Sequence, residues 1–319
     1  MQIFHDPAQL PTDYGSTVLS VGNYDGLHLG HRFLLARVVE RARALHALSV
    51  AVTFEPHPSH LLRPGAGPRL ITPNLRERLD LLATTGIDAT VVLPFTAEFS
   101  QQSAEDFVRS VLLERLRAVE VHEGDNFRFG FRAEAGVHEL TALGRQFGFA
   151  VHIYQPLRVH GLDVSSSRIR KLISAGDLRR ARWLLGRPFS ILSTPARGRG
   201  IGSRLTVPTI NFAEYEGVTP AAGVYISRMQ LAAGTADEVC FDSVTNVGTR
   251  PTFADASFAI ETHLLDFRPV PLNEATPLRL TFLARLRDEQ QWPSPEALRE
   301  QIGRDVLAAR RYLRRLGRP

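Results

Sequence analysis

The chain has 319 residues, of which 44% are hydrophobic and 22% are charged. These are the proportions of a globular protein with room for two domains. The single cysteine, Cys240, excludes an internal disulfide and a metal cluster built on cysteines. The sequence also lacks an apolar stretch long enough to span a membrane, and its start lacks the blocks of a signal peptide. We therefore expect a cytoplasmic protein without a membrane partner.

The charge balance is basic, with 38 Lys and Arg against 33 Asp and Glu, a net charge of +5 and a pI of about 9.8. Nearly all of the positive charge is arginine, and Lys171 is the only lysine. A basic balance is compatible with nucleic-acid binding. However, the positive residues are spread along the chain, and phosphorylated small molecules would account for the charge equally well. Charge alone leaves both classes of partner open.

The first half of the chain alternates short apolar runs with helical patterns. We expect strands at residues 18–21, 49–54, 89–93, 118–121 and 151–154, and helices at 32–48, 76–84 and 104–116. Strands separated by helices predict a doubly wound parallel sheet, which binds its ligands at the carboxyl ends of the strands. The first domain, residues 1–185, is therefore predicted to be α/β.

The pattern changes near residue 186, where Gly186 and Pro188 end a helix. Short alternating runs follow at 209–212, 223–231, 239–247, 258–267 and 278–286. They predict a small antiparallel β-barrel or sandwich over residues 186–319. Ser294 and Pro295 begin a final helix that Gly317 ends. The predicted fold class is thus α/β plus β, with a doubly wound domain followed by a small antiparallel β-barrel and a C-terminal helix.

The segment Gly22-Asn23-Tyr24-Asp25-Gly26-Leu27-His28-Leu29-Gly30-His31 connects the first of these strands to the first helix. His28 and His31, three residues apart, are expected side by side on the first helical turn. Backbone N–H groups and the positive end of the helix dipole converge there, and Gly30 has no side chain to block a close approach. These donors suit the charge that develops on a phosphate under attack. The segment predicts a nucleotide site.

Two further motifs follow later strands of the first domain. In Thr53-Phe54-Glu55-Pro56-His57-Pro58, the prolines fix the backbone as it leaves the sheet and place His57 at the carboxyl edge. In Gly124-Asp125-Asn126-Phe127-Arg128-Phe129-Gly130, Asn126 is flanked by aromatic residues between two glycines. Taken alone, the first motif is as compatible with a rigid loop as with a binding site, and the second is compatible with a β-turn held by hydrophobic anchors.

A serine cluster, Ser165, Ser166 and Ser167, begins a helix. Arg168 and Arg170 follow in its first turn, where cations oppose the helix dipole unless an anion lies among them. A triphosphate would supply that anion. A solvated basic helix face is the alternative.

In the second domain, a glycine loop at residues 198–202 precedes Pro208-Thr209-Ile210-Asn211. The standard Gly-rich phosphate cradle and the protein-kinase signatures are both missing from the sequence. Thr209 and Asn211 project to one face of a strand, where they offer oxygen ligands of the type that Mg²⁺ prefers. Glu261 lies on the opposite face of a later strand from Ile260 and Thr262, facing either water or a site.

These motifs together resemble a known family. The segment of residues 22–31 resembles the signature of H-x-G-H adenylyl- and cytidylyltransferases, and within them the bacterial bifunctional riboflavin kinase/FMN adenylyltransferases, with Tyr24 where that family more often has Phe. At least six motifs follow the family order, namely residues 22–31, 53–58, 124–130, 165–170, 208–211 and 246–253. The chain departs at Thr206 (usually Gly), at Ile210 (usually Ala), and at 271–273, which replaces a Tyr-Gly pair.

The resemblance implies an enzyme that phosphorylates riboflavin to FMN with ATP and then adenylylates FMN to FAD, with release of pyrophosphate. It implies His28, His31 and Glu261 as catalytic residues, the last as the base of the kinase reaction. The implied nucleotide-binding residues are Gly22, Asn23, Asp25, Gly26, Gly30, Asn126, Ser165, Ser166, Ser167, Arg168, Arg170, Gly198, Gly200 and Gly202. Those implied for flavin are Pro56, His57, Arg250 and Pro251, and those for Mg²⁺ are Thr209 and Asn211.

Riboflavin, FMN, FAD and ATP are therefore the expected partners, without nucleic acid, and the chain is expected to be a monomer or a weak homo-oligomer. Two other functions stay open. One is a transferase of the same superfamily acting on another phosphorylated substrate, which would turn over ATP or CTP without flavin. The other is a basic nucleic-acid binder with a vestigial transferase fold, which would retain RNA or DNA in a salt-sensitive way and turn over nothing.

Overall fold

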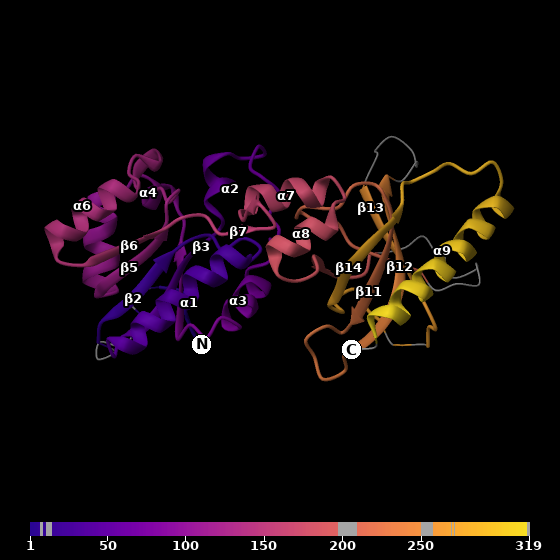
Figure 1. Cartoon of the computed structure of the whole chain (residues 1–319), viewed down its shortest axis with the longest axis horizontal. Coiled ribbons are helices and arrows are strands. Elements are labelled where there is room, and N and C mark those ends of the chain that lie inside the picture. Colours follow the sequence, from indigo (N-terminus) through magenta and orange to yellow (C-terminus); the bar gives the residue numbers. More distant parts are fainter. Residues whose placement is uncertain are drawn as a thin grey trace. The chain divides into compact units, whose positions relative to one another are not determined.

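The computed structural model describes residues 1–6, 9–10, 15–196, 209–249, 258–268, 270 and 272–317 (Figure 1). It divides into two compact units, Met1–Ser166 and Ser167–Pro319. Each unit is described by itself below. The domain boundary between residues 185 and 186 stays a prediction.

Unit 1 contains a six-stranded sheet in the order β1-β4-β3-β2-β5-β6, with all neighbours parallel. Its strands are β1 (Gln2–Phe4), β2 (Thr17–Val21), β3 (Leu48–Glu55), β4 (Ala89–Pro94), β5 (Ala118–Gly124) and β6 (Ala150–Tyr154). A separate antiparallel pair is formed by β7 (Arg158–Val159) and β8 (Leu162–Asp163). The predicted parallel sheet is confirmed.

Helices cover both faces of this sheet. They are α1 (Leu29–Ala44), α2 (Pro58–Leu62), α3 (Leu75–Ala83), α4 (Ala97–Ser100), α5 (Ala104–Phe107), the π-helix η2 (Val108–Arg115), the 3₁₀-helix η3 (Phe131–Ala133) and α6 (Val137–Phe147). Successive side chains of a strand point to opposite faces. Accordingly, Val18 packs with residues of α1 and α3, whereas Leu19 packs with residues of α5, η2 and α6. The two apolar clusters make the sheet doubly wound.

The strand order reverses next to β2. The chain adds β3 and β4 on one side of β2, and it later adds β5 and β6 on the other side. Such a reversal leaves a crevice at the carboxyl ends of the strands, and open α/β sheets bind their ligands there. Because β2, β3 and β5 are adjacent and parallel, the segments that follow them emerge at one edge.

Several predicted boundaries are wrong in detail. Helix α1 begins at Leu29 and ends at Ala44, because the backbone of His46 turns to a left-handed φ of 52° that no helix continues. Strand β5 runs to Gly124, three residues beyond the predicted end at 121. The polar residues His122 and Glu123 end the apolar run but not the strand. Helix α6 and strand β1 were not predicted.

Unit 2 opens with α7 (Ser166–Ser174, its first residue in unit 1) and α8 (Leu178–Leu185) and continues into a six-stranded antiparallel sheet in the order β10-β13-β12-β11-β14-β9. Its strands are β9 (Ser190–Ser193), β10 (Thr209–Asn211), β11 (Gly223–Leu231), β12 (Val239–Thr249), β13 (Phe258–Leu264) and β14 (Leu278–Arg287). β13 ends before the predicted residue 267, since Asp266 has a left-handed φ of 52° in the turn.

The two edges of this sheet are joined. An isolated antiparallel bridge links Pro195 to Phe212, and the N–H of Ala196 donates to the carbonyl of Asn211 at 2.8 Å. The N–H of Ala213 donates to the carbonyl of Thr194 at 2.9 Å. These bonds close the sheet and confirm the predicted small barrel.

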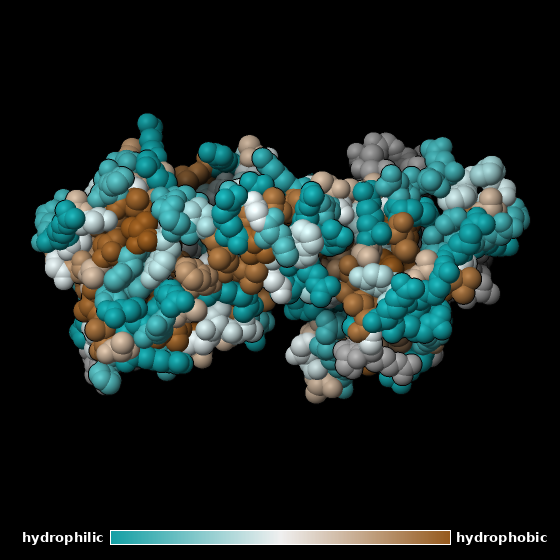
Figure 2. Space-filling model, in the orientation of Figure 1, coloured by the Kyte–Doolittle hydropathy of each residue, from teal (hydrophilic) through white to brown (hydrophobic). Residues whose placement is uncertain are grey.

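The predicted C-terminal helix is also confirmed, as α9 (Pro295–Leu316). Ser294 is its N-cap, with the side chain accepting from the N–H of Ala297 at 3.2 Å. Ala309 and Leu313 bury one side of α9 among residues of the sheet. Hydrophilic residues predominate along α9 on the face drawn in Figure 2. In the described part of the chain, every helix is too short or too polar to cross a membrane.

Candidate active sites

The turn between β2 and α1 places both histidines of the H-x-G-H motif at the start of the helix. His28 is the N-cap of α1, and its Nδ1 accepts a hydrogen bond from the N–H of His31 at 3.2 Å. Since Nδ1 accepts, the proton of the neutral His28 ring lies on Nε2, which makes that atom a donor. The two rings are stacked, with centroids 3.6 Å apart and planes inclined by 15°.

His31 is neutral in this environment. Burial and the neighbouring His28 ring lower the pKa of His31 well below its usual range. Among the described residues, its Nδ1 is buried and has no hydrogen-bond partner. The ring of Tyr24 meets it edge-on at 5.4 Å, and the Tyr24 hydroxyl donates to the carbonyl of Ser20 at 2.8 Å. Tyr24 therefore anchors the His31 ring to the end of β2.

Two glycines of the turn are required by its packing. Gly26 has a left-handed φ of 79°, and a Cβ there would lie 2.8 Å from Cδ1 of Ile71. A Cβ at Gly30 would lie 3.2 Å from Nδ1 of His28. The buried carboxylate of Asp25 accepts from the N–H groups of Ile71 and Thr72 at 2.8 and 2.9 Å, so it holds the turn against the segment that precedes α3.

The other predicted residues of the first site follow the neighbouring strands. Pro56 and His57 follow β3, and His57 caps α2, with its Nδ1 accepting from the N–H of Ser59 at 3.1 Å. Asn126 follows β5 and keeps its side-chain oxygen against Gly124, where a Cβ would lie 3.2 Å away. The Ser166 hydroxyl donates to the carbonyl of Asp25 at 3.0 Å. These segments all belong to the carboxyl edge of β2, β3 and β5.

Glu123 is a residue of this edge that the sequence analysis missed. Its Oε1 accepts from the N–H of Val21 at 2.6 Å, which ties β5 to the end of β2. Burial raises the pKa of this carboxyl well above its usual range. In the sequence, Glu123 could have been noticed as an acidic residue directly before Gly124 that continues a buried strand.

In unit 2, three polar residues lie opposite one another on adjacent strands. Glu261 of β13 pairs with Asn211 of β10 on one side and with Asn246 of β12 on the other. Residues directly opposite in an antiparallel pair carry their side chains on the same face, about 5 Å apart. Asn211, Glu261 and Asn246 therefore form a row across the sheet, defined here as the polar row. Asn246 had not been singled out as a site residue.

The alternation predicted for β13 is confirmed where its side chains are described. Ile260, Thr262 and Leu264 are buried, whereas Glu261 is half-buried on the other face. Thr209 stands two residues before Asn211 on β10, opposite His263, and therefore shares the face of the polar row. A carboxylate, two amides and a hydroxyl are thus available on one face of three strands.

Several predicted site residues stay predictions. Gly198, Gly200, Gly202, Arg250 and Pro251 lie outside the described residues, as do the departures at Thr206 and Pro271. Arg168 is exposed and Arg170 donates to the Ser167 hydroxyl at 3.2 Å, and all three belong to unit 2. Their assignment to the nucleotide site of unit 1 therefore rests on the sequence pattern. Gly22, Asn23 and Ser165 lie in the predicted segments, with their roles untested.

Comparison with known proteins places each half of the chain in a known family. A family model described as FAD synthetase matches residues 10–168, and one described as riboflavin kinase matches residues 185–313. A bifunctional riboflavin kinase/FMN adenylyltransferase of Pseudomonas fluorescens is 34% identical over 97% of each chain. The protein of the same name from Escherichia coli K12 is 33% identical over 97% of this chain and 96% of the relative.

A solved structure described as a macrolide-efflux protein from Streptococcus pneumoniae has the same fold, with a TM-score of 0.83. It covers 97% of this chain and 98% of that chain at 24% sequence identity. The likeness in fold therefore extends over both units, while the curated relatives match over nearly their whole length. The chain belongs to the bifunctional riboflavin kinase/FMN adenylyltransferase family.

Proposed function

We propose that two separate groups of the described residues carry out the two reactions of this family. The chain is an enzyme that uses ATP twice, first to phosphorylate riboflavin to FMN and then to adenylylate FMN to FAD. We assign the adenylylation to the turn between β2 and α1, and the phosphorylation to the polar row of Asn211, Glu261 and Asn246. This assignment is supported by the positions of the two sites, which lie in the segments matched by the two family models.

In the adenylyl transfer, an FMN phosphate oxygen attacks the α-phosphorus of ATP and pyrophosphate leaves. The nucleophile is already anionic, so the reaction requires neither a covalent enzyme intermediate nor a general base. We assign to His28 a hydrogen bond from Nε2 to the α-phosphate, strengthened as charge builds up there. The N-terminus of α1 adds backbone donors and its dipole. Positioning and electrostatic stabilisation supply the rate.

In the kinase reaction, the 5′-hydroxyl of riboflavin attacks the γ-phosphorus of ATP and loses its proton. We assign Glu261 as the base that accepts this proton. Asn211 and Asn246 flank Glu261 across the sheet, so they restrict its rotamers and donate to substrate oxygens or to the carboxylate. Positioning by such groups dominates phosphoryl transfer.

Mg²⁺ is proposed as the metal of the kinase reaction. The hydroxyl of Thr209 and the amide oxygen of Asn211 are hard oxygen donors on the face of Glu261, and they fit an ion that keeps water and phosphate oxygens as its other ligands. When bound there, Mg²⁺ would neutralise phosphate charge. The other residues that the family motifs imply for nucleotide and flavin binding are proposed to have those roles here.

The experiment that tests the function is incubation of the purified chain with riboflavin, ATP and Mg²⁺, followed by separation of the flavins. FMN should appear first and FAD should follow at its expense. ATP or CTP turnover that is independent of any flavin would support the other transferase function instead. A cytoplasmic location and a monomeric or weakly associating state stay predictions from the sequence, and size-exclusion chromatography tests the latter.

A further inference from the structure

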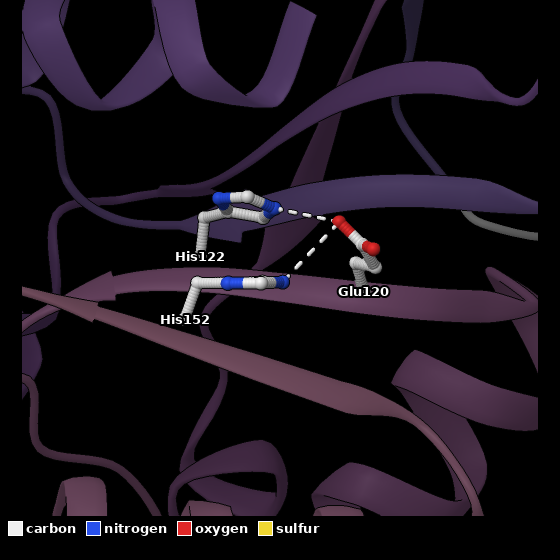
Figure 3. Close-up of side chains that lie close together, drawn as sticks. All are labelled: Glu120, His122 and His152. Atoms are coloured by element: carbon white, nitrogen blue, oxygen red, sulfur yellow. Dashed lines mark hydrogen bonds and ion pairs between the residues drawn. The ribbon is translucent and has the colours of Figure 1, made fainter. Parts of the chain in front are cut away.

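A cluster of one carboxylate and two imidazoles lies in unit 1 on strands β5 and β6, outside the residues assigned above. Glu120 and His122 alternate on β5 and share one face of the sheet, and His152 of β6 pairs directly with His122. In Figure 3 both imidazole rings point toward the same oxygen of Glu120. We call these three side chains the EHH cluster.

The distances within the EHH cluster match those of a tetrahedral metal site. Nε2 of His122 lies 3.2 Å and Nε2 of His152 lies 3.4 Å from Oε2 of Glu120. Zinc bonds of about 2.0–2.1 Å to nitrogen and oxygen place two ligands of a tetrahedron about 3.3 Å apart. The three ligand atoms all lie within 4.8 Å of one another, so closing the site requires the two rings to approach by up to about 1.5 Å.

The surroundings support the ring orientation that a metal needs. Nδ1 of His122 lies 2.9 Å from the hydroxyl of Tyr154, which is two residues from His152 on β6. A metal-binding histidine usually donates its other N–H to such an oxygen, which fixes the tautomer and the ring. The His122 and His152 rings are stacked, with centroids 4.5 Å apart and planes inclined by 24°. In the described residues, Nε2 of His152 is buried and makes no hydrogen bond, although Oε2 of Glu120 lies 3.4 Å away.

Arg41 of α1 competes for the carboxylate. Its Nε donates to Oε2 of Glu120 at 3.0 Å and its terminal nitrogen to Oε1. The Glu120 side chain is 8% exposed, whereas that of Arg41 is 42% exposed. Arg41 can therefore move into solvent, and Glu120 can then coordinate an ion that the two imidazoles also bind. Without an ion, the same residues form a polar network that joins α1 to the sheet.

We propose that Glu120, His122 and His152 bind a divalent transition-metal ion of the zinc type. Two imidazoles and one carboxylate suit zinc and its neighbours in the first transition row, and they do not suit Mg²⁺, which prefers oxygen ligands. With three protein ligands, the fourth position is left to water. The ion would clamp the edge strand β6 to β5. The site is separate from the proposed kinase metal in ligand type and in unit.

The test is a titration of the full, metal-free chain with Zn²⁺ by calorimetry, and with Co²⁺ by its visible absorption, which reports tetrahedral coordination. The variants are His152→Ala and Arg41→Ala, with His138→Ala as the control, since His138 is an exposed histidine of α6. We expect one equivalent to bind to the wild type and to His138→Ala. His152→Ala should weaken binding at least about tenfold, because loss of even an outer partner has that effect.

Arg41→Ala separates the metal site from a merely structural network. Removing the competing guanidinium should tighten Zn²⁺ binding, whereas a structural network without a site would only lose stability. The melting temperature of each metal-free variant checks its fold, and His152→Gln replaces His152→Ala if the latter unfolds. The proposal is overturned if the wild type shows no saturable binding, if only Arg41→Ala binds, or if a folded His152 variant binds like the wild type.

Discussion

The imidazole rings of His28 and His31 lie nearly parallel, with their centroids 3.6 Å apart. Two rings at this separation repel each other when both are protonated, so the pair carries at most one positive charge near neutral pH. Burial, and after it the neighbouring His28 ring, lowers the pKa of His31 well below its usual range. The pair is therefore suited to donate hydrogen bonds to a phosphate. Before ATP binds, the two rings repel each other little because they are not both charged.

The first prediction concerns His28→Asn. Asparagine is a good N-cap, so its side chain can replace Nδ1 as the acceptor for the N–H of His31, but it removes the Nε2 donor. FAD formation from FMN should fall by about 10²–10³-fold, the effect of losing one donor to a developing oxyanion. Riboflavin phosphorylation should be unchanged. Separating FMN and FAD by chromatography measures both rates, and an equal loss of both activities in a folded variant would refute the assignment.

The second prediction is the converse for Glu261→Gln. The amide keeps the shape of the side chain and its place between Asn211 and Asn246, but it cannot take a proton. Riboflavin phosphorylation should fall by about 10²–10⁴-fold, while FMN supplied directly should still be converted to FAD. Glu238→Gln, at an exposed glutamate before β12, is the matched control. Undiminished FMN production by Glu261→Gln would remove the base from the mechanism.

The third prediction is a pH dependence of stability caused by His31. Its folded-state pKa is lowered, so below its ordinary value of about 6.5 the unfolded chain binds a proton that the folded chain does not. The stability that the neutral ring contributes is therefore present above pH 6.5 and is lost as the pH falls toward the folded pKa. Between pH 6 and pH 5 the wild type should lose up to about 1.4 kcal/mol more unfolding free energy than His31→Gln.

Urea unfolding of both proteins at a series of pH values, followed by the signal of unit 1, provides this measurement. Groups remote from residue 31 cancel in the difference, which therefore reports the titration of His31 together with its stacked neighbour His28. A constant difference from pH 7 to pH 5 would show that the His31 ring is protonated equally in both states, contrary to its burial.

The fourth prediction concerns the interior of the barrel in unit 2. The Thr245 hydroxyl lies 2.7 Å from that of Ser227 and 2.9 Å from that of Thr262, and all three residues are fully buried. Thr245→Val keeps the shape but leaves its partners without this bond, so the unfolding free energy should fall by about 1–3 kcal/mol. Thr235→Val, at an exposed turn hydroxyl, should change it by less than about 0.5 kcal/mol. Equal effects in denaturant titrations would contradict a role for the buried hydroxyls.

The sequence predicts well those features whose signal is local. The strand before Gly22, the placement of the two histidines at the start of a helix and the alternation around Glu261 all have signals in neighbouring residues. The structure confirms each of them, although α1 begins before the predicted residue 32. The capping bond from His31 to His28 follows from the same spacing. The π-helical form of η2 has no such signal, because the same apolar pattern suits an α-helix.

Features that depend on pairing between distant segments could not be predicted. Asn246 meets Glu261 only through the register of β12 and β13, and His152 meets His122 only because β6 is placed next to β5. In sequence, Glu120 and His122 look like the polar end of a strand. They can be recognised as part of a cluster only in the folded structure, where the neighbouring strand and Arg41 of α1 lie beside them.

The reversal of strand order beside β2 also has a consequence for how substitutions could alter the specificity of this enzyme. Three loops from three separate strands share one rim, and only the loop after β2 carries the paired histidines. On the proposed assignment, substitutions after β3 or β5 would alter which acceptor binds, or how tightly the product is held, while leaving both histidines in place. A change of acceptor specificity would then be concentrated in those two connections rather than in the histidine turn.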